Sequence, residues 1–281
     1  MNIIHAAAEL RARLATERAV AFVPTMGNLH EGHLELARIA RENGGPVVVS
    51  IFVNPLQFGP GEDFDKYPRT LEADCAKLAG LADIVFAPAV SEMYPEQQTL
   101  FVEPPPMASE LCGAFRPGHF RGMATVVLKL FNLVQPRVAV FGKKDYQQLA
   151  IIRQMVTQFN LPISLVGAET ARAPDGLALS SRNQYLRPGE RAEAPRLYRA
   201  LQEAARRLRA GEKNLEQIQQ EAVKLLERHG WMVEYVSIRS QAGLGLPAAG
   251  EANLVILGAA RLGSTRLIDN LEVCLGAQAP I

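Results

Sequence analysis

The sequence predicts an α/β fold with a doubly wound parallel sheet, followed by a smaller C-terminal α+β domain. Two observations predict the sheet: short apolar runs alternate with helical segments, and polar loops follow several of those runs. A shift in composition after about residue 170, toward long charged helices, predicts the second domain. We therefore expect domains at 1–172 and 173–281.

Composition excludes several classes of protein. The 281 residues include 30 Lys and Arg against 29 Asp and Glu, so the net charge does not indicate binding to nucleic acid or to a membrane surface. Three widely spaced cysteines, without a CxxC pair, argue against a disulfide scaffold or a cysteine-rich zinc site. Residues 1–20 carry five charges, unlike a signal peptide, and no apolar run is long enough to span a bilayer. We expect a cytoplasmic protein without nucleic-acid or membrane partners.

The first element in order is a strand over 19–23, followed by the turn 24–33 (PTMGNLHEGH) and a helix over 34–41. Gly27 and Gly32 allow a sharp turn, and the unpaired amides at a helix start attract phosphate. His30 and His33 can both lie at this turn. Their spacing leaves three interpretations open: phosphate binding, which we favour, a metal pair, or a structural role.

The apolar, β-branched run 47–53 predicts the next parallel strand, buried on both faces. Its end carries Gln57, at the carboxyl edge where ligands bind in such sheets. The segment 59–67 is rich in glycine, proline and acidic residues, and we interpret it as a mobile loop that could act as a lid.

The alternation of strands, loops and helices continues along the chain. It includes a strand over 137–141, a polar loop at 142–145 and a helix over 146–159. The remaining predictions before residue 170 are helices at 71–79 and 125–133, strands at 83–87, 99–102 and 163–166, and a polar loop at 116–122. In the C-terminal part we expect helices at 190–210 and 215–229 and strands at 232–239, 254–260 and 265–268.

Further candidate residues lie in the polar loops. Lys144 follows a predicted strand and could carry a cation to a phosphate, although a solvated lysine is the ordinary alternative. Ser180, Ser181 and Arg182 combine hydroxyls with a guanidinium, an arrangement that suits a polyphosphate leaving group. Gln148, like Gln57, suits a small polar substrate, although a surface glutamine is the commoner explanation.

Several familiar sites are absent from the sequence. We find no GxxxxGK[ST] loop, no GxGxxG turn and no Ser-His-Asp order, so Walker-type phosphatases, dinucleotide oxidoreductases and serine hydrolases lose their main support. A Rossmann-like ATP site without a P-loop remains. Catalysis there would place a substrate oxygen in line with a phosphorus and neutralise the leaving group.

Six segments together form a recognisable series: 24–33 (PTMGNLHEGH), 52–58 (FVNPLQF), 67–69 (YPR), 115–120 (FRPGHF), 141–149 (FGKKDYQQL) and 179–183 (LSSRN). In sequence, order and spacing they resemble the signatures of the pantothenate synthetase family, and the resemblance extends over essentially the whole chain. The HxxH motif of that family relates it to nucleotidyltransferases and class I aminoacyl-tRNA synthetases.

This resemblance implies a cytoplasmic homodimeric ligase that joins pantoate to β-alanine, with ATP as a substrate and Mg²⁺ bridging the β and γ phosphates. The first step would give pantoyl adenylate and pyrophosphate, and the second would release AMP. The implied catalytic residues are His30, His33, Lys144, Ser180 and Arg182. The implied ATP-binding set adds Met26, Gly142, Asp145, Leu179 and Ser181, with Gly142 and Asp145 at the ribose. Gln57 and Gln148 would bind pantoate. Asp74 is the candidate Mg²⁺ ligand.

One residue departs from the pattern of the family. Lys143 stands where Glu or Gln is usual, beside the proposed catalytic lysine, and we expect it to point away from the phosphates. Two rival functions remain open at this stage. One is a nucleotidyltransferase that transfers AMP to a phosphorylated precursor, and the other is a nucleotide-binding regulatory module without catalysis. Binding of tRNA is disfavoured by the balanced charge.

Overall fold

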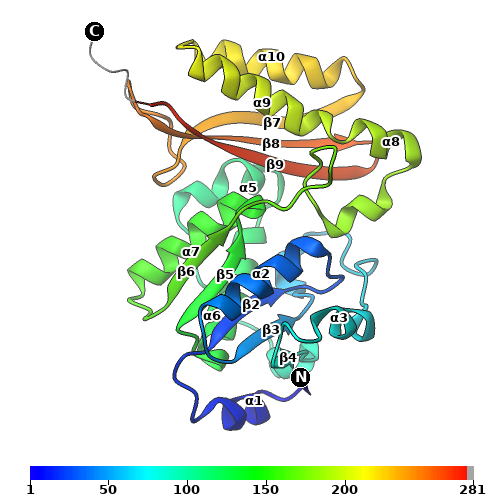
Figure 1. Ribbon diagram of the computed structural model, residues 1–281, viewed down its shortest axis with the longest axis vertical. Helices are drawn as coiled ribbons and strands as arrows, with labels where there is room; N and C mark the ends of the chain where they lie inside the picture. Colours follow the sequence, from blue (N-terminus) through cyan, green and yellow to red (C-terminus); the bar gives the residue numbers. More distant parts are fainter. Residues whose placement is uncertain (277–281) are drawn as a thin grey trace.

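A computed structural model describes residues 1–276, which form two sheets with helices packed on them (Figure 1). The first sheet is parallel, in the order β1-β4-β3-β2-β5-β6. Its strands are β1 (Asn2–Ile4), β2 (Ala21–Thr25), β3 (Val47–Ile51), β4 (Ile84–Phe86), β5 (Val138–Gly142) and β6 (Ser164–Ala168). This is the predicted doubly wound architecture.

The strand order places a switch point between β2 and β5. From β2 the chain adds β3 and β4 on one side, then returns to add β5 and β6 on the other. The loops that leave the carboxyl ends of β2 and β5 therefore diverge and leave a crevice, the usual ligand position in such sheets.

Helices cover both faces of this sheet because the strands are apolar on both sides. One apolar cluster joins the sheet to α1 (Ala7–Leu14), α6 (His119–Val134) and α7 (Tyr146–Gln158). The cluster on the opposite face includes α2 (Glu31–Glu42) and α3 (Leu71–Leu78). The short helices in this part are η1 (Pro55–Gln57), α4 (Val90–Met93), η2 (Pro106–Ser109), α5 (Cys112–Phe115) and η3 (Lys143–Asp145).

The C-terminal sheet is antiparallel, with β7 (Trp231–Ser240), β8 (Asn253–Leu262) and β9 (Thr265–Cys274) in sequence order. On β8, Leu254 and Ile256 pack in the cluster that contains the helices, whereas Val255 and Leu257 pack with Tyr146 of the first part. The period-2 alternation thus gives this sheet two buried faces. The helices are η4 (Ser181–Tyr185), α8 (Pro188–Glu193), α9 (Arg196–Arg209) and α10 (Leu215–Glu227).

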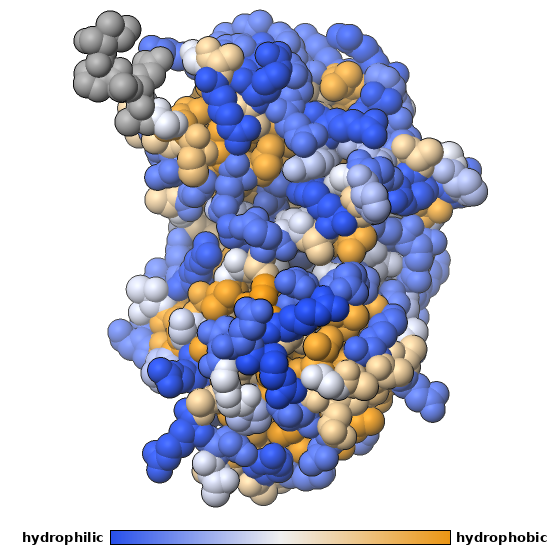
Figure 2. All heavy atoms as spheres, in the orientation of Figure 1, coloured by the Kyte–Doolittle hydropathy of each residue, from blue (hydrophilic) through white to orange (hydrophobic). Residues whose placement is uncertain are grey.

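Each sheet has its own apolar core, and we propose the two as separate domains that meet near residue 172. The C-terminal sheet lies between α9 and α10 on its outer side and the first domain on the other (Figure 1). The outer surface over α9 and α10 is mainly hydrophilic (Figure 2), as expected for amphipathic helices that bury one face.

Several expected elements differ in the structure. Residues 99–102 form no strand: Leu100 is 82% exposed, and the Val102 amide donates to the Thr125 hydroxyl. The polar loop expected at 116–122 ends at Gly118, whose φ of +80° precedes the first turn of α6. The helix expected at 190–210 is interrupted at Pro195, because proline lacks the N–H that a helix interior requires.

Two elements at the N-terminus, β1 and α1, were not predicted. Two of the three β1 residues are exposed, and α1 buries only Leu10 and Leu14, so neither segment has a strong hydrophobic period. No helix in residues 1–276 has the length and apolar character needed to cross a membrane.

Candidate active site

A pocket of about 220 Å³ lies at the crevice between the loops after β2 and β5. Its wall includes every residue that the sequence predicts for ATP and pantoate binding. These are Met26, His30, His33, Gln57, Gly142, Lys144, Asp145, Gln148, Leu179, Ser180, Ser181 and Arg182. The predicted binding residues, which are up to 156 positions apart in the sequence, therefore lie around one cavity.

The turn after β2 has a left-handed backbone at two successive residues. Gly27 has φ +84° and Asn28 has φ +50°, and a Cβ on Gly27 would lie 2.9 Å from Ile51 Cγ2. Glycine is therefore required at position 27 for both its conformation and its space. This turn directs the chain from β2 into α2 and brings His30 to the N-cap of that helix.

Asp74 holds this turn from α3. Its carboxylate accepts the amide N–H of Asn28 at 2.8 Å and that of Leu29 at 2.7 Å, and it also accepts the Thr70 hydroxyl at 3.1 Å. That Asp74 binds Mg²⁺ stays a prediction, and its surroundings do not favour it, because its side chain is fully buried, is absent from the pocket wall and already accepts these donors. Asp74 instead positions the loop that presents the histidines.

Replacing Asp74 with asparagine is expected to lower the free energy of unfolding by about 1–3 kcal/mol. The amide offers one acceptor oxygen where the carboxylate offers two, and its NH₂ group would face a backbone donor. Urea denaturation measures the change, with Glu72→Gln on the exposed side of α3 as the matched control. Equal stability of D74N and the wild type would contradict this role.

The two histidines contact each other at the start of α2. Their ring centroids are 4.1 Å apart, and the His30 amide donates to His33 Nδ1 at 3.3 Å. Because Nδ1 of His33 accepts this bond, its ring proton lies on Nε2, which is then a donor. Gly32 leaves room for the pair, since a Cβ there would lie 3.0 Å from the His30 ring.

Both imidazoles are neutral at physiological pH. Burial, followed by the charge of Lys144, lowers the pKa of His30 to about 4. Burial, followed by His30 and Lys144, lowers the pKa of His33 to about 3. A neutral imidazole donates one ring N–H without adding charge, so these residues can act as hydrogen-bond donors to phosphate oxygens.

We expect these histidines to make the fold less stable in mild acid. The unfolded chain protonates its histidines near pH 6.5, whereas the lowered pKa values keep His30 neutral down to about pH 4 and His33 down to about pH 3 in the folded state. Since the unfolded state binds more protons in this window, stability falls as the pH decreases from 6.5 toward 4. Urea midpoints at pH 7.5 and 5.0 measure the fall, and His33→Gln should reduce it. An unchanged fall in H33Q would contradict this assignment.

The two lysines after β5 have different environments. Lys144 lines the pocket, whereas Lys143 Nζ lies 2.5 Å from Glu169 Oε1 and 2.7 Å from Glu272 Oε2. Lys143 is absent from the pocket wall and links the loop to β9. The side chain of Asn270, also on β9, donates to the carbonyls of Lys143 and Lys144 at 2.8 and 2.9 Å. The C-terminal domain therefore fixes the backbone that carries Lys144.

The segment that begins the C-terminal domain supplies the other cation. Ser180 caps η4, and its hydroxyl accepts the Arg182 amide at 3.3 Å. The Arg182 guanidinium forms a two-bond ion pair with Asp63 at 2.8 and 3.1 Å, and the Ser181 hydroxyl donates to the Asn28 carbonyl at 3.3 Å. Arg182 is thus held over the pocket by the loop that we interpreted as a lid.

Gln57 and Gln148 lie on the pocket wall with apolar neighbours. Gln57 Oε1 accepts the Asn54 amide at 3.1 Å, and Gln57 Nε2 lies 3.2 Å from the Met26 sulfur. Asn54 is itself fixed, since its Oδ1 accepts the Tyr94 hydroxyl at 2.7 Å. The nearby apolar side chains in the wall are Phe52, Met123, Val126, Val127 and Leu130.

Sequence reasoning did not select Arg116 and His119, which also line the pocket. Arg116 forms an ion pair with Glu62 at 2.6 Å and lies 3.0 Å from His119 Nε2, while His119 Nδ1 donates to the Gln57 carbonyl at 2.8 Å. Burial, then Arg116, lowers the pKa of His119 to about 4. Their only sequence signal was the polar segment 115–120, which pointed to the loop and not to these contacts.

Known proteins resemble this chain over nearly its whole length. A family model described as pantoate-beta-alanine ligase matches residues 2–272. A pantothenate synthetase from Methylobacillus flagellatus is 58% identical over 274 residues, which cover 97% of this chain and 98% of that protein. The crystal structure of pantothenate synthetase from Thermus thermophilus matches with a TM-score of 0.93 and 46% identity, over 98% of this chain and 100% of that one.

A further relative was solved as a complex with ligands. It is the pantoate-beta-alanine ligase from Francisella tularensis, complexed with beta-gamma ATP and beta-alanine, with a TM-score of 0.81 and 34% identity over 96% of this chain and 97% of that one. The family model, the curated relatives and the solved structures all extend over nearly the full chain. The chain belongs to the pantoate-β-alanine ligase family.

Proposed function

We propose that this protein condenses pantoate with β-alanine in an ATP-dependent reaction, giving pantothenate, AMP and pyrophosphate. The observation that carries the proposal is a single pocket in which His30, His33, Lys144 and Arg182 lie with two glutamines, in a member of the pantoate-β-alanine ligase family. Cationic and N–H groups on one part of its wall suit a triphosphate, and amide groups beside apolar side chains suit pantoate.

In the first step the pantoate carboxylate attacks the α-phosphorus of ATP. The bond from that phosphorus to the bridging oxygen of the β-phosphate breaks, and pyrophosphate leaves with the electron pair. The carboxylate is already ionised at neutral pH, so the step needs no general base. The protein contributes alignment and charge: His30 and His33 donate to phosphate oxygens, Lys144 neutralises the α-phosphoryl group, and Ser180 with Arg182 binds the departing phosphates.

In the second step the amine of β-alanine attacks the carbonyl carbon of pantoyl adenylate and AMP departs. The same groups remain useful here, because negative charge again develops on the phosphate that leaves. Gln57 and Gln148 would hold the two hydroxyls of pantoate. The apolar wall at Val126, Val127 and Leu130 would pack against its two methyl groups and exclude water.

Met26, Leu179 and Ser181 complete the proposed ATP site, with Gly142 and Asp145 at the ribose. Mg²⁺ is proposed to enter as part of the substrate, MgATP, on the β and γ phosphate oxygens. Within residues 1–276 no group of three His, Cys, Asp or Glu side chains has the arrangement of a metal site. No protein ligand is therefore assigned to the ion.

A cytoplasmic homodimer is proposed as the working form of the enzyme. The location is supported by Cys75, Cys112 and Cys274, which are free thiols suited to a reducing compartment. Support for association comes from the edge strand β1, where Ile3 is 46% exposed, and from Leu100. Light scattering during size-exclusion chromatography tests the dimer, and a mass near the 30.7 kDa of one chain would contradict it.

The function is tested by incubating the protein with ATP, Mg²⁺, pantoate and β-alanine and analysing the products by mass spectrometry. The proposal expects pantothenate and AMP in equal amounts. Production of ADP would contradict it, as would multiple-turnover release of AMP in the absence of β-alanine. A dinucleotide product would instead support the nucleotidyltransferase alternative.

A further inference from the structure

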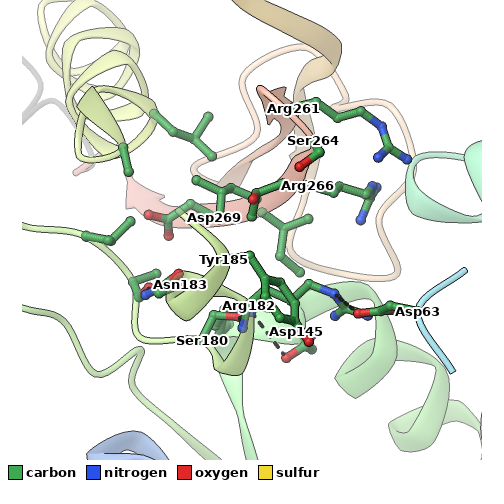
Figure 3. Close-up of a pocket in the computed structure, with 18 of the residues that line it drawn as sticks. Asp63, Asp145, Ser180, Arg182, Asn183, Tyr185, Arg261, Ser264, Arg266 and Asp269 are labelled. Carbon is green, nitrogen blue, oxygen red and sulfur yellow. Dashed lines mark hydrogen bonds and ion pairs between the residues drawn. The ribbon is translucent and has the colours of Figure 1, made fainter. Parts of the chain in front are cut away.

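A second cavity, of about 440 Å³, adjoins the pocket described above and continues between the two domains (Figure 3). The two share five residues, Arg116, Lys144, Asp145, Ser180 and Arg182. The opposite wall comes from the far end of the C-terminal hairpin, where Arg261, Ser264 and Arg266 lie on and between β8 and β9. The reaction outlined above assigns no role to these three side chains.

The hairpin end has an excess of positive charge that the fold does not neutralise. Arg261 and Arg266 are direct cross-strand partners in the β8–β9 register, a position in which like charges are unfavourable. Both face one carboxylate, Glu234 of β7. Arg266 Nη2 lies 2.7 Å from Glu234 Oε2, whereas Arg261 Nε is 3.5 Å from Glu234 Oε1. One carboxylate thus forms ion pairs with two guanidinium groups.

Arg261 is the less constrained of the two. Its side chain is 46% exposed, compared with 14% for Arg266, which also donates to the Cys112 sulfur. Arg261 can therefore move toward an anion in the cavity while Arg266 keeps Glu234. Across the cavity, Ser180 and Arg182 are the groups proposed to bind the departing phosphates (Figure 3).

We propose that this cavity is a pyrophosphate subsite, in which Arg261 and Ser264 bind the leaving group after it separates from the α-phosphorus. Pyrophosphate carries several negative oxygens in tetrahedral groups, which suit the forked donors of arginine and a hydroxyl. The subsite lies beyond Ser180 and Arg182, so it receives the product rather than the bound triphosphate. This inference rests on the proposed adenylation reaction.

The test is ATP–pyrophosphate exchange in the presence of pantoate and Mg²⁺ without β-alanine, with radiolabelled pyrophosphate as the probe. Arg261→Gln is expected to raise the KM for pyrophosphate about tenfold, the usual effect of losing a hydrogen bond to a charged group. Ser264→Ala should raise it in the same direction. The KM for ATP in the forward reaction should change less than about twofold. Arg206→Gln, which removes an exposed arginine of α9, is the matched control and should behave as wild type.

Three results would overturn the inference. The first is a KM for pyrophosphate that is unchanged in R261Q and S264A while the wild type exchanges normally. The second is an equal rise in the KM for ATP, which would make Arg261 a ligand of the bound triphosphate. The third is a rise in the KM for β-alanine with pyrophosphate unaffected, which would assign the cavity to the second substrate. Absence of exchange in the wild type would contradict the proposed adenylation, and therefore also the pyrophosphate subsite that rests on it.

Discussion

Replacing Lys144 with alanine is expected to lower the rate of adenylate formation by about 10²–10³-fold, the usual cost of removing a preorganised group that stabilises transition-state charge. Lys144 lines both cavities and is held at its backbone by Asn270. Its ammonium is the cation that we assign to the reacting phosphorus. The fold should be retained, because within residues 1–276 the ammonium forms no ion pair other than a long one of 3.9 Å with Asp145. Single-turnover formation of pyrophosphate from ATP and pantoate measures the effect.

Lys143→Ala is the matched control for that experiment. Its ion pairs with Glu169 and Glu272 are broken by the substitution, so a loss of thermal stability is expected. The rate of adenylation should remain within about tenfold of the wild type, since Lys143 is not on the pocket wall. If K143A lost activity as completely as K144A, the assignment of the catalytic cation would be wrong.

His33→Ala is expected to lower the same rate by about 10²-fold, because it removes a neutral donor to the phosphates and leaves the His30 amide without its acceptor. His33→Gln should recover part of the rate, since a glutamine amide can supply an N–H. The rates are measured at pH 7.5, where both rings are neutral. His229→Ala, an exposed residue after α10, is the control.

A second property separates this role from acid–base catalysis. With the pKa of His33 lowered to about 3 by burial, the wild-type adenylation rate should not follow an ionisation of this residue between pH 6 and 8. A rate that rises or falls with an apparent pKa near 6.5, and loses that dependence in H33Q, would identify His33 as a proton-transfer group and contradict a hydrogen-bonding role.

The sequence allowed prediction of the sheet and of the loops that form the site. The apolar runs before Gly27 and Gly142 have the composition of buried parallel strands, and the carboxyl edge of such a sheet is a common ligand position. Hydrophobic period and composition were sufficient to predict these strands, because a buried strand has a continuous apolar sequence. They failed at residues 99–102, where an apolar segment has no strand partner.

Pairings between distant side chains were not predictable in the same way. Nothing near Asp74 in the sequence indicates that its carboxylate accepts the amides of Asn28 and Leu29, 46 and 45 residues away. The ion pair of Arg182 with Asp63 joins residues 119 positions apart. Such contacts depend on how the domains and loops pack, which hydrophobic period does not encode. The sequence therefore indicated which residues surround the site, but not which of them hold the others in place.

The central claim, that pantoate is activated as an acyl adenylate, is tested most directly by following oxygen. Pantoate labelled with ¹⁸O in its carboxylate is converted with ATP and β-alanine, and the released AMP is examined by mass spectrometry. Attack of the carboxylate on the α-phosphorus predicts one carboxylate oxygen in each AMP, because the second step breaks the bond between the acyl carbon and that oxygen. Unlabelled AMP, or label in inorganic phosphate or pyrophosphate, would contradict the account.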